Sequence, residues 1–270
     1  MNCAAMTDPA ATTEDGFLGG RLRLRQLVLG HRAGHDAILL AAATRARPGD
    51  RVVEFGAGVG AAGLALAARV GGLDLLLVER DPQLAALARA NAAANGIRAA
   101  AVVLDVEAGA DAFAAVDLLP DSVDVVLMNP PFNDPSRHRG SPDGARQAAH
   151  VATATTLESW VHAARRVLKS GGALTLIWRA DGLAEVLAAL ARGFGSLALL
   201  PVHGKPDEPA IRVLIRAVKG GRAPLQIHAA VHLNEASGTP TALARAVLNG
   251  EQILPPAVTS SRAPGKNCSA

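Results

Sequence analysis

The chain has 270 residues, of which 50% are hydrophobic and 19% charged, and its formal net charge is +3. This length and apolar content suffice for a folded core, and they exclude a wholly disordered protein, which would be poor in apolar residues. The chain has five Phe, two Trp and no Tyr. This argues against a nucleic-acid binder built on a sheet of stacking aromatics.

The two cysteines and the N-terminus bear on the cellular compartment. Cys3 and Cys268 lie near opposite ends and have neither metal-ligand spacing nor a pairing pattern. The N-terminus lacks the basic and apolar regions of a signal peptide, and no apolar run reaches the roughly 20 residues of a membrane span. We therefore expect a reduced, soluble, cytoplasmic protein.

The first predicted elements precede the main repeat pattern. Residues 1–15 are polar and small, and we expect a disordered tail. Apolar and Arg residues alternate over 16–29 around a Gly-Gly pair, which predicts a hairpin. Helical periodicity starts at Asp36 and is stopped by Pro48-Gly49.

Apolar β-like runs then alternate with helical stretches. The expected strands are 51–55, 73–79, 99–104, 123–128, 173–178, 196–202 and 210–218. This alternation predicts an α/β fold with a doubly wound, seven-stranded, mostly parallel sheet. The short polar connection 203–209 predicts an antiparallel last strand. We expect one domain over 16–254, with the hairpin and helix at 16–48, the core at 49–254, and a disordered tail at 255–270.

A glycine loop lies between the first strand of the core and its helix. Gly56, Gly58 and Gly60 permit a sharp turn and close approach to a ligand, beside the free N–H groups of a helix N-terminus. The same spacing satisfies a dinucleotide fingerprint, so the glycines alone leave NAD possible. Glu54 precedes the loop, where it can hold the ammonium of an amino-acid cofactor and would repel a pyrophosphate. A tight turn without a ligand is the simpler alternative.

Two further acids follow the next two strands. Glu79 ends the second strand and suits the two hydroxyls of a ribose, as in both NAD and S-adenosylmethionine sites. Asp105 follows the third strand, where it can accept a hydrogen bond from an adenine amino group. The alternatives are a solvated strand end for Glu79 and a turn cap for Asp105.

The fourth strand ends in an Asn-Pro-Pro-Phe loop made by Asn129, Pro130, Pro131 and Phe132. Prolines end the strand and supply no N–H donors, so carbonyl acceptors point outward beside the Asn129 side chain. Convergent neutral acceptors suit a planar NH2 group, whose nitrogen can then attack a methyl sulfonium. Phe132 offers a flat face for an extruded base. A strand-ending Pro-Pro turn is the structural alternative.

Together, the acid, the spaced glycines and the Asn-Pro-Pro-Phe loop resemble the amino-methyltransferases of the class I, Rossmann-like fold. The resemblance implies S-adenosyl-L-methionine as cofactor. It also implies a methyl acceptor of one of three kinds: adenine N6, guanine N2 of rRNA, or a protein glutamine.

Residues 22–40 contain Gly34-His35-Asp36 followed by Ala37 to Leu40, and this pattern resembles the bacterial tRNA1(Val) adenine-N6-methyltransferase family. The late patterns Arg212 to Leu214 and Lys219 to Leu225 are also similar, and the resemblance covers 16–254. It implies a monomer, a tRNA substrate and a place for Asp36 near the cofactor. A helix-capping role is the alternative for Asp36.

Basic residues near the Asn-Pro-Pro-Phe loop and in the late strand are candidate phosphate contacts. The candidates are Arg137, Arg139, Arg146, Lys219 and Arg222. Segment 133–150 can equally be a polar loop without such a role. Neither His138 nor His150 has a ligand partner four residues away, so we expect no metal.

The leading hypothesis is an S-adenosylmethionine-dependent N-methyltransferase on RNA, with adenine N6 of a tRNA as acceptor. A glutamine N5-methyltransferase is the nearest alternative, but its family carries an N-terminal helical domain and here the first core strand begins at residue 51. An NAD-dependent oxidoreductase explains the glycines and leaves the Asn-Pro-Pro-Phe loop without a role. A non-catalytic binding scaffold would be expected to lose motif residues that this sequence keeps.

Overall fold

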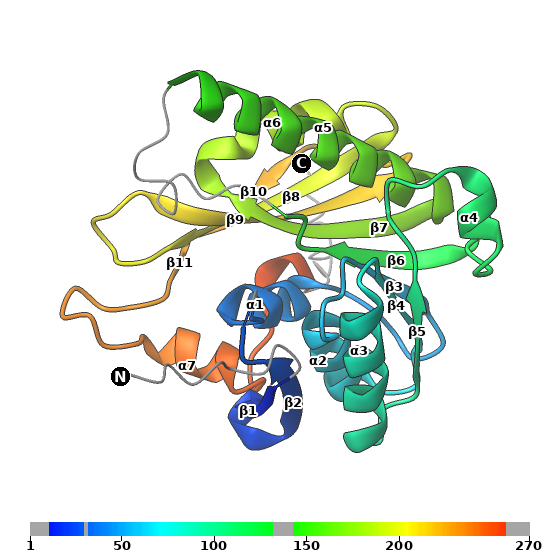
Figure 1. Ribbon diagram of the computed structural model, residues 1–270. Coiled ribbons are helices and arrows are strands. Elements are labelled where there is room, and N and C mark those ends of the chain that lie inside the picture. Colours follow the sequence, from blue (N-terminus) through cyan, green and yellow to red (C-terminus); the bar gives the residue numbers. More distant parts are fainter. Residues whose placement is uncertain (1–10, 30–31, 132–142, 258–270) are drawn as a thin grey trace, which may run out of the picture.

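The computed structural model describes residues 11–29, 32–131 and 143–257, and within the last range it describes the side chains of 155–256. A central sheet is covered by helices on both faces (Figure 1). Its long strands are β3 (Arg51–Phe55), β4 (Asp74–Glu79), β5 (Ala99–Val103), β6 (Val123–Met128), β7 (Leu168–Arg179), β8 (Phe194–His203) and β9 (Ala210–Lys219).

The sheet order is β5-β4-β3-β6-β7-β9-β8, and β9 alone among these strands runs in the direction opposite to all the others. The predicted doubly wound sheet with an antiparallel last strand is therefore confirmed. Two strands that we did not predict, β10 (Gln226–Ile227) and β11 (Val231–His232), pair with β8. Two residues each are too few to show a period in the sequence.

Each face of the sheet packs its own core. One face carries α1 (His35–Ala43), α2 (Ala61–Val70), α3 (Pro82–Ala94) and α7 (Ala242–Leu248), and its helices contribute many Ala side chains. The other carries α4 (Ala110–Ala114), α5 (Asp143–Val167) and α6 (Leu183–Leu190), with larger side chains such as Phe55, Trp160 and Trp178 in its core. Alanines let α1 and α2 approach closely, whereas the aromatic rings fill the wider space under α5 and α6.

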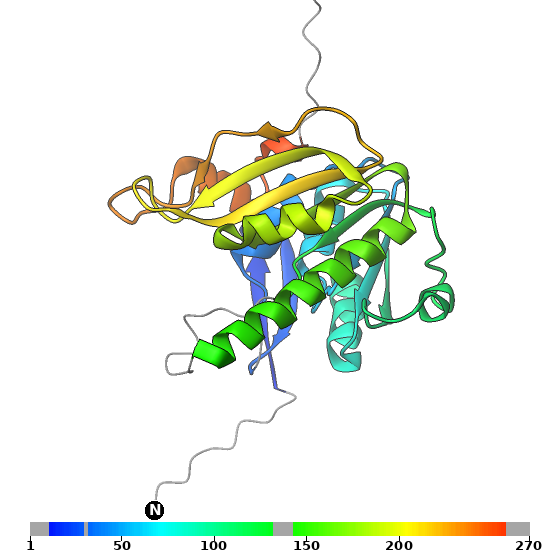
Figure 2. The ribbon, with the colours of Figure 1, turned by 90° about the horizontal axis from the view of Figure 1, so that it is seen from above.

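Helix α5 is the longest helix and crosses the sheet obliquely beside α6 (Figure 2). It begins at Asp143, so the prediction that 133–150 forms a loop is wrong from that residue on. Residues 143–150 lack helical apolar periodicity in the sequence, whereas Leu157 and Trp160, further along the helix, are apolar and buried. Throughout the described residues, no helix combines the length and apolarity needed to cross a membrane.

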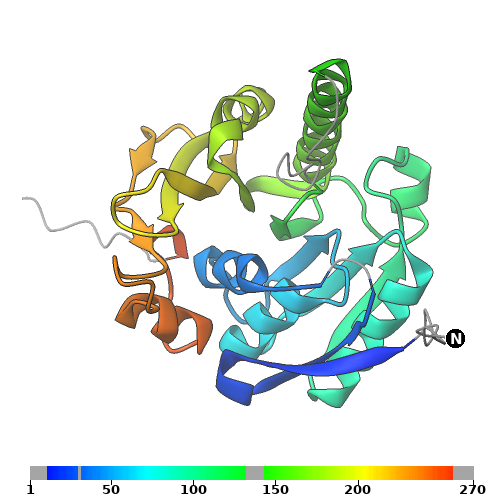
Figure 3. The ribbon, with the colours of Figure 1, turned by 60° about the vertical axis from the view of Figure 1, so that its left-hand side comes forward.

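An N-terminal hairpin stands outside the sheet, with β2 (Leu22–Leu27) lying along α3 (Figure 3). Its first strand, β1 (Thr12–Phe17), starts earlier than predicted. Residues 12–15 form part of this strand, so the prediction that they belong to a disordered tail is wrong. Polar cross-strand contacts hold this segment: Asp15 accepts a hydrogen bond from Gln26 at 2.7 Å and pairs with Arg32. Such pairs stabilise a strand that carries no apolar alternation.

The C-terminal boundary also differs slightly from the prediction. The tail was expected from residue 255, but Pro255–Ala257 form a 3-10 turn. Buried Leu254 donates its N–H to the carbonyl of Ala42, which fixes this turn against α1.

Candidate active site

The candidate site lies at the carboxyl edge of the parallel strands, where the sheet order reverses between β3 and β6. Ligands of doubly wound folds bind at this switch point. The register pairs Phe55 with Met128, so Gly56 and Asn129 follow side by side. Phe55 also pairs with Val78 of β4, which precedes Glu79. The topology therefore brings together the glycine loop, the ribose acid and the Asn-Pro-Pro-Phe loop.

The three glycines of the loop share a positive φ, and two of them, Gly56 and Gly58, differ in what an added side chain would meet. All have positive φ, at 64° for Gly56, 56° for Gly58 and 87° for Gly60. A Cβ on Gly56 would come within 2.4 Å of Cη2 of Trp160, whereas a Cβ on Gly58 would meet no described atom within 4 Å. Gly56 is thus required by packing, and Gly58 keeps open space beside the loop, as a bound ligand needs. Trp160, on α5, was missed by the sequence analysis.

Glu79 holds the glycine loop from β4. Its Oε2 accepts the N–H of Gly58 at 2.7 Å, and its Oε1 accepts the N–H of Asp81 at 3.0 Å. The side chain is buried, with the residue 8% exposed. Each carboxylate oxygen accepts more than one hydrogen bond, so capacity for two hydroxyls remains. The sequence predicted the ribose contact but not this second function in shaping the loop.

Glu54 lies beneath the first turn of α2. Its Oε2 accepts the N–H of Gly63 at 2.7 Å, and a side chain on Gly63 would clash with that oxygen. Burial raises the pKa of Glu54 to about 8, although hydrogen bonds from the backbone of Gly63 and Ala62 oppose the rise and the charge of Glu79 adds to it. A carboxyl held this way gains strongly from a nearby cation. The contact with a cofactor ammonium remains a prediction.

The remaining predicted cofactor residues occupy more exposed positions. Asp105 follows β5, and its Oδ1 accepts the N–H of Glu107 at 2.9 Å, which makes it a turn cap and leaves the second oxygen for a ligand. Asp36 lies in the first turn of α1 and pairs with Nε of Arg212 at 2.9 Å, tying α1 to β9. Across the described residues, no His, Cys, Asp and Glu side chains gather in a group that could hold a metal.

Asn129 is the most unusual side chain of the site. Its Oδ1 is buried, yet no hydrogen-bond donor reaches it from the part of the chain that the structure describes. A buried acceptor left unsatisfied costs about 1–3 kcal/mol, so a donor from outside the described residues, such as a bound ligand, would stabilise it. Pro130 is buried and Pro131 is exposed, while Phe132 lies outside the described residues.

The two candidate phosphate contacts that the structure describes, Lys219 and Arg222, do not lie at this edge. Arg137, Arg139 and the side chain of Arg146 lie outside the described residues. Because β9 is antiparallel, its last residue, Lys219, lies at the opposite, amino edge of the parallel strands. There Nζ of Lys219 donates to Asp121 and to the carbonyl of Leu168, at 2.7 Å each. Lys219, and Arg222 after it, therefore lie at the edge opposite the cofactor loop, and their contact with RNA phosphates stays a prediction.

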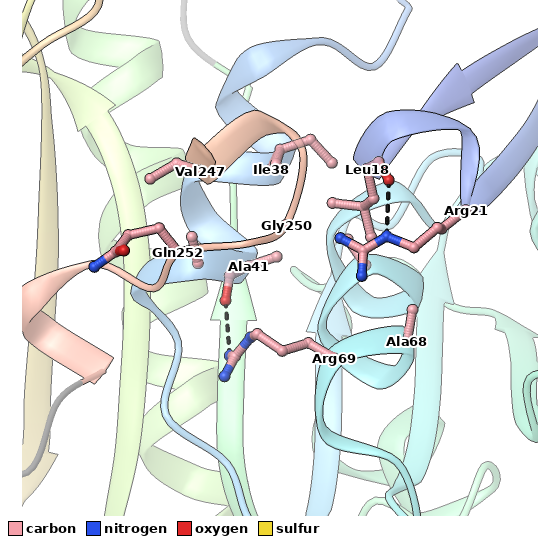
Figure 4. A pocket seen from close by; sticks show the side chains of 11 residues that line it. Leu18, Arg21, Ile38, Ala41, Ala68, Arg69, Val247, Gly250 and Gln252 are labelled. Carbon is pink, nitrogen blue, oxygen red and sulfur yellow. Dashed lines mark hydrogen bonds between the residues drawn. The ribbon is translucent and has the colours of Figure 1, made fainter. Parts of the chain in front are cut away.

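A separate cavity of about 130 Å³ lies between the hairpin turn, α1, α2 and α7 (Figure 4). Its walls include Ala41, Ala65 and Val247. The two arginines at its rim bind backbone carbonyls: Arg69 donates to Ala41 at 3.1 Å, and Arg21 donates to Leu18 at 3.1 Å. These contacts satisfy carbonyls at element ends, a structural function. The cavity is lined by the later turns of α2, away from the glycine loop.

Comparison with known proteins agrees with the geometry of the site. Residues 34–205 match the methyltransferase small domain family. A tRNA1(Val) (adenine(37)-N6)-methyltransferase of Porphyromonas gingivalis is 29% identical over 214 residues, which span 74% of this chain and 79% of the relative. Ribosomal RNA small subunit methyltransferase C of Pseudomonas syringae pv. tomato is 31% identical over 130 residues, 48% of this chain and 32% of the relative.

A solved structure extends the agreement to nearly the whole fold. A predicted O-methyltransferase from Agrobacterium tumefaciens is 32% identical, covers 81% of this chain and 98% of its own, and has a TM-score of 0.67. The match of the family model over most of the core, together with these relatives, confirms the predicted enzyme class and cofactor. The chain therefore belongs to the methyltransferase small domain family and is an S-adenosylmethionine-dependent methyltransferase.

Proposed function

We propose that this enzyme methylates an exocyclic amino group of a nucleobase in RNA, with adenine N6 of a tRNA as the acceptor. One observation carries the choice of an amino group: Oδ1 of Asn129 is a buried, neutral acceptor without a described donor, next to the glycine loop. An amino N–H satisfies it. The choice of tRNA is supported by the Porphyromonas gingivalis relative.

The residues at the carboxyl edge fit the cofactor. Gly58 leaves room at the loop, Glu79 has acceptor capacity for the ribose hydroxyls, and buried Glu54 favours a neighbouring cation such as the ammonium of the methionine part. Asp105 retains a free carboxylate oxygen for the adenine amino group. When bound, S-adenosylmethionine supplies an electrophilic methyl group on a sulfonium.

Asn129 acts on the acceptor nitrogen. An exocyclic amine is a weak nucleophile because its lone pair is delocalised into the ring. By accepting one N–H, the amide Oδ1 orients the nitrogen and favours its pyramidal form. Pro130 contributes no N–H that could compete for an acceptor. Phe132 is proposed to stack on the extruded base, and Arg137, Arg139 and Arg146 to contact phosphates of the RNA.

Two other acceptors have specific support. Guanine N2 is also an exocyclic amine, and the Pseudomonas syringae relative is an rRNA methyltransferase. A hydroxyl acceptor is suggested by the Agrobacterium tumefaciens structure. A hydroxyl requires deprotonation by a base, and the amide of Asn129 is not one, so the geometry favours an amine. A protein glutamine shares the amine chemistry and is separated from RNA only by experiment.

The test is methyl transfer to defined acceptors, followed by digestion and mass spectrometry of the products. The acceptors are an unmodified tRNA1(Val) transcript, the same transcript with guanine at position 37, 16S rRNA, and a peptide release factor. N6-methyladenosine in the first transcript alone supports the proposal. Product only in rRNA or in the release factor would replace it with the corresponding alternative.

A further inference from the structure

Asn91 of α3 joins three parts of the molecule and is 1% exposed. Its Oδ1 accepts the N–H of Arg25 at 2.8 Å, and its Nδ2 donates to the carbonyl of Arg25 at 3.1 Å. The same Nδ2 also donates to the carbonyl of Val59 at 3.0 Å. Val59 is the residue between Gly58 and Gly60. One buried amide thus connects helix α3, the hairpin and the glycine loop.

Asn95 lies one helical turn further along α3 and makes only part of this set. Its Oδ1 accepts the N–H of Arg23 at 2.9 Å, and its Nδ2 donates to the carbonyl of Arg23 at 2.7 Å. Its Nδ2 also donates to the carbonyl of Asn91, at 2.8 Å. Asn95 therefore reproduces the hairpin contact of Asn91 but not the contact with the loop.

The loop needs an external restraint because glycines flank Val59. Gly58 and Gly60 both have positive φ, a region that glycine enters at no steric cost, so their own backbones do not select one conformation. The peptide group between Val59 and Gly60 is held at both ends. Its carbonyl accepts from Asn91, and its N–H donates to the carbonyl of Ala57 at 2.7 Å. A flip of this peptide would redirect the start of α2.

We infer that Asn91 is a positioning residue for cofactor binding, which fixes the glycine loop in its binding geometry and couples it to the N-terminal hairpin. The role rests on the proposed binding of S-adenosylmethionine at this loop. Because coupling between two sites is reciprocal, cofactor binding stabilises the hairpin segment that Asn91 holds.

The matched pair of variants is Asn91→Ala and Asn95→Ala, measured by calorimetric titration with S-adenosylmethionine. Both lose the side-chain hydrogen bonds to β2, so both lower the melting temperature. Loss of the buried loop contact is expected to weaken cofactor binding about tenfold in Asn91→Ala, against less than about twofold in Asn95→Ala. When S-adenosylmethionine is varied at saturating RNA, its KM rises in Asn91→Ala, while kcat stays within about twofold of the wild type. Equal cofactor affinities in the two variants would overturn the inference.

A measurement on the unaltered protein covers the case in which Asn91→Ala does not fold. Amide hydrogen exchange, followed by nuclear magnetic resonance, is compared with and without S-adenosylhomocysteine. The inference requires that the ligand slow exchange at the N–H of Arg25 more than at that of Arg23. Equal or absent protection at the two amides contradicts it.

Gly58→Val separates this inference from the placement of the cofactor. A side chain there occupies the open space and strains a positive φ, so binding is lost if the cofactor lies at the loop. Unchanged binding by Gly58→Val would refute the placement itself. Lost binding in Gly58→Val with equal affinities in Asn91→Ala and Asn95→Ala would refute only the positioning role.

Discussion

The acidic side chains at the amino ends of β4 and β6 and at the carboxyl ends of β3 and β4 are satisfied in different ways. At the amino edge, charged groups are exposed or half-buried and matched in pairs: Lys169 lies 2.7 Å from Asp124, and Lys219 lies 2.7 Å from Asp121. At the carboxyl edge, Glu54 and Glu79 are buried beside each other, without an ion pair among the described residues.

This difference separates side chains that stabilise the fold from side chains that are expected to bind a ligand. The two charges of a surface ion pair are neutralised by each other and by water, so neither needs a ligand. Burying two carboxyls and the acceptor of Asn129 costs free energy, which a bound cation or hydrogen-bond donor would offset. Buried polar groups that lack partners within the protein are expected at sites where function requires them. The following substitutions test this contrast, starting with the largest expected effect.

Asn129→Ala removes the unsatisfied acceptor at the carboxyl edge. If the amide orients the methyl acceptor, kcat falls by about 100- to 1,000-fold, the range seen when one preorganised polar contact to a reacting group is removed. Affinity for S-adenosylmethionine should change less than about twofold, and the melting temperature should not fall, because Oδ1 of Asn129 accepts no hydrogen bond from the described residues. Single-turnover methylation of tRNA measures the rate. Retained activity would assign the buried oxygen a purely structural role.

Glu79→Ala affects both the loop and the cofactor. Hydrogen bonds to an ionised group contribute roughly 1.5–3 kcal/mol, so the dissociation constant of S-adenosylmethionine should rise about 10- to 150-fold. Glu79→Gln serves as the control, since it keeps one acceptor oxygen and should lie between the wild type and the alanine variant. Calorimetric titration decides, and unaltered affinity in both variants would show that the ribose does not bind here.

Glu54→Gln tests the buried carboxyl through pH. The pKa of Glu54 is raised by burial from 4.5 to about 8, so the folded state binds more protons than the unfolded state between these values. Stability from this group is therefore highest at low pH and falls as pH rises toward 8. The Gln variant should lack this fall and melt at a higher temperature than the wild type at pH 9. Parallel melting curves at all pH values would refute a raised pKa.

Lys219→Ala should have the smallest effect. The pair with Asp121 lies at the amino edge, where an exposed ion pair is worth about 1 kcal/mol or less. Cofactor affinity and KM for tRNA should equal those of the wild type, as should those of Arg222→Ala. A raised KM for tRNA in either variant would show that the RNA reaches the amino edge, and the contrast between the edges would then no longer mark function.

The sequence reveals those parts of the fold and site that depend on local order. The buried strands contain short apolar runs, and Gly56 and Glu79 are found because they directly follow the apolar stretches of β3 and β4. Parallel pairing then brings the strand ends together. The first residues of β1 escaped prediction because their pairing depends on polar partners in β2 and beyond, which no local pattern shows.

Contacts between distant segments escaped prediction for the same reason. Trp160 approaches Gly56 across more than 100 residues, and it reads in the sequence as one apolar position of a helix. Asn91 did leave a signal. An asparagine inside an Ala-rich helix is disfavoured, since its amide competes for backbone hydrogen bonds, and its presence there indicates that the amide has a partner. Asn95 gave no such signal, because it caps the C-terminus of α3, where asparagine is common.

The asparagine pair also gives the hairpin a partner for its second edge. Four helical residues rise about 6.0 Å, and two strand residues extend about 6.6 Å, so two amides on α3 can meet alternate residues of β2 as rungs of a ladder. Because the helix and strand spacings differ, a third such contact would be out of register. Helix side chains can therefore pair in this way only with a short strand. Without it, β2 would present a bare edge that another chain could extend. Replacing Asn91 and Asn95 together should therefore promote self-association through edge pairing, in addition to loosening the hairpin.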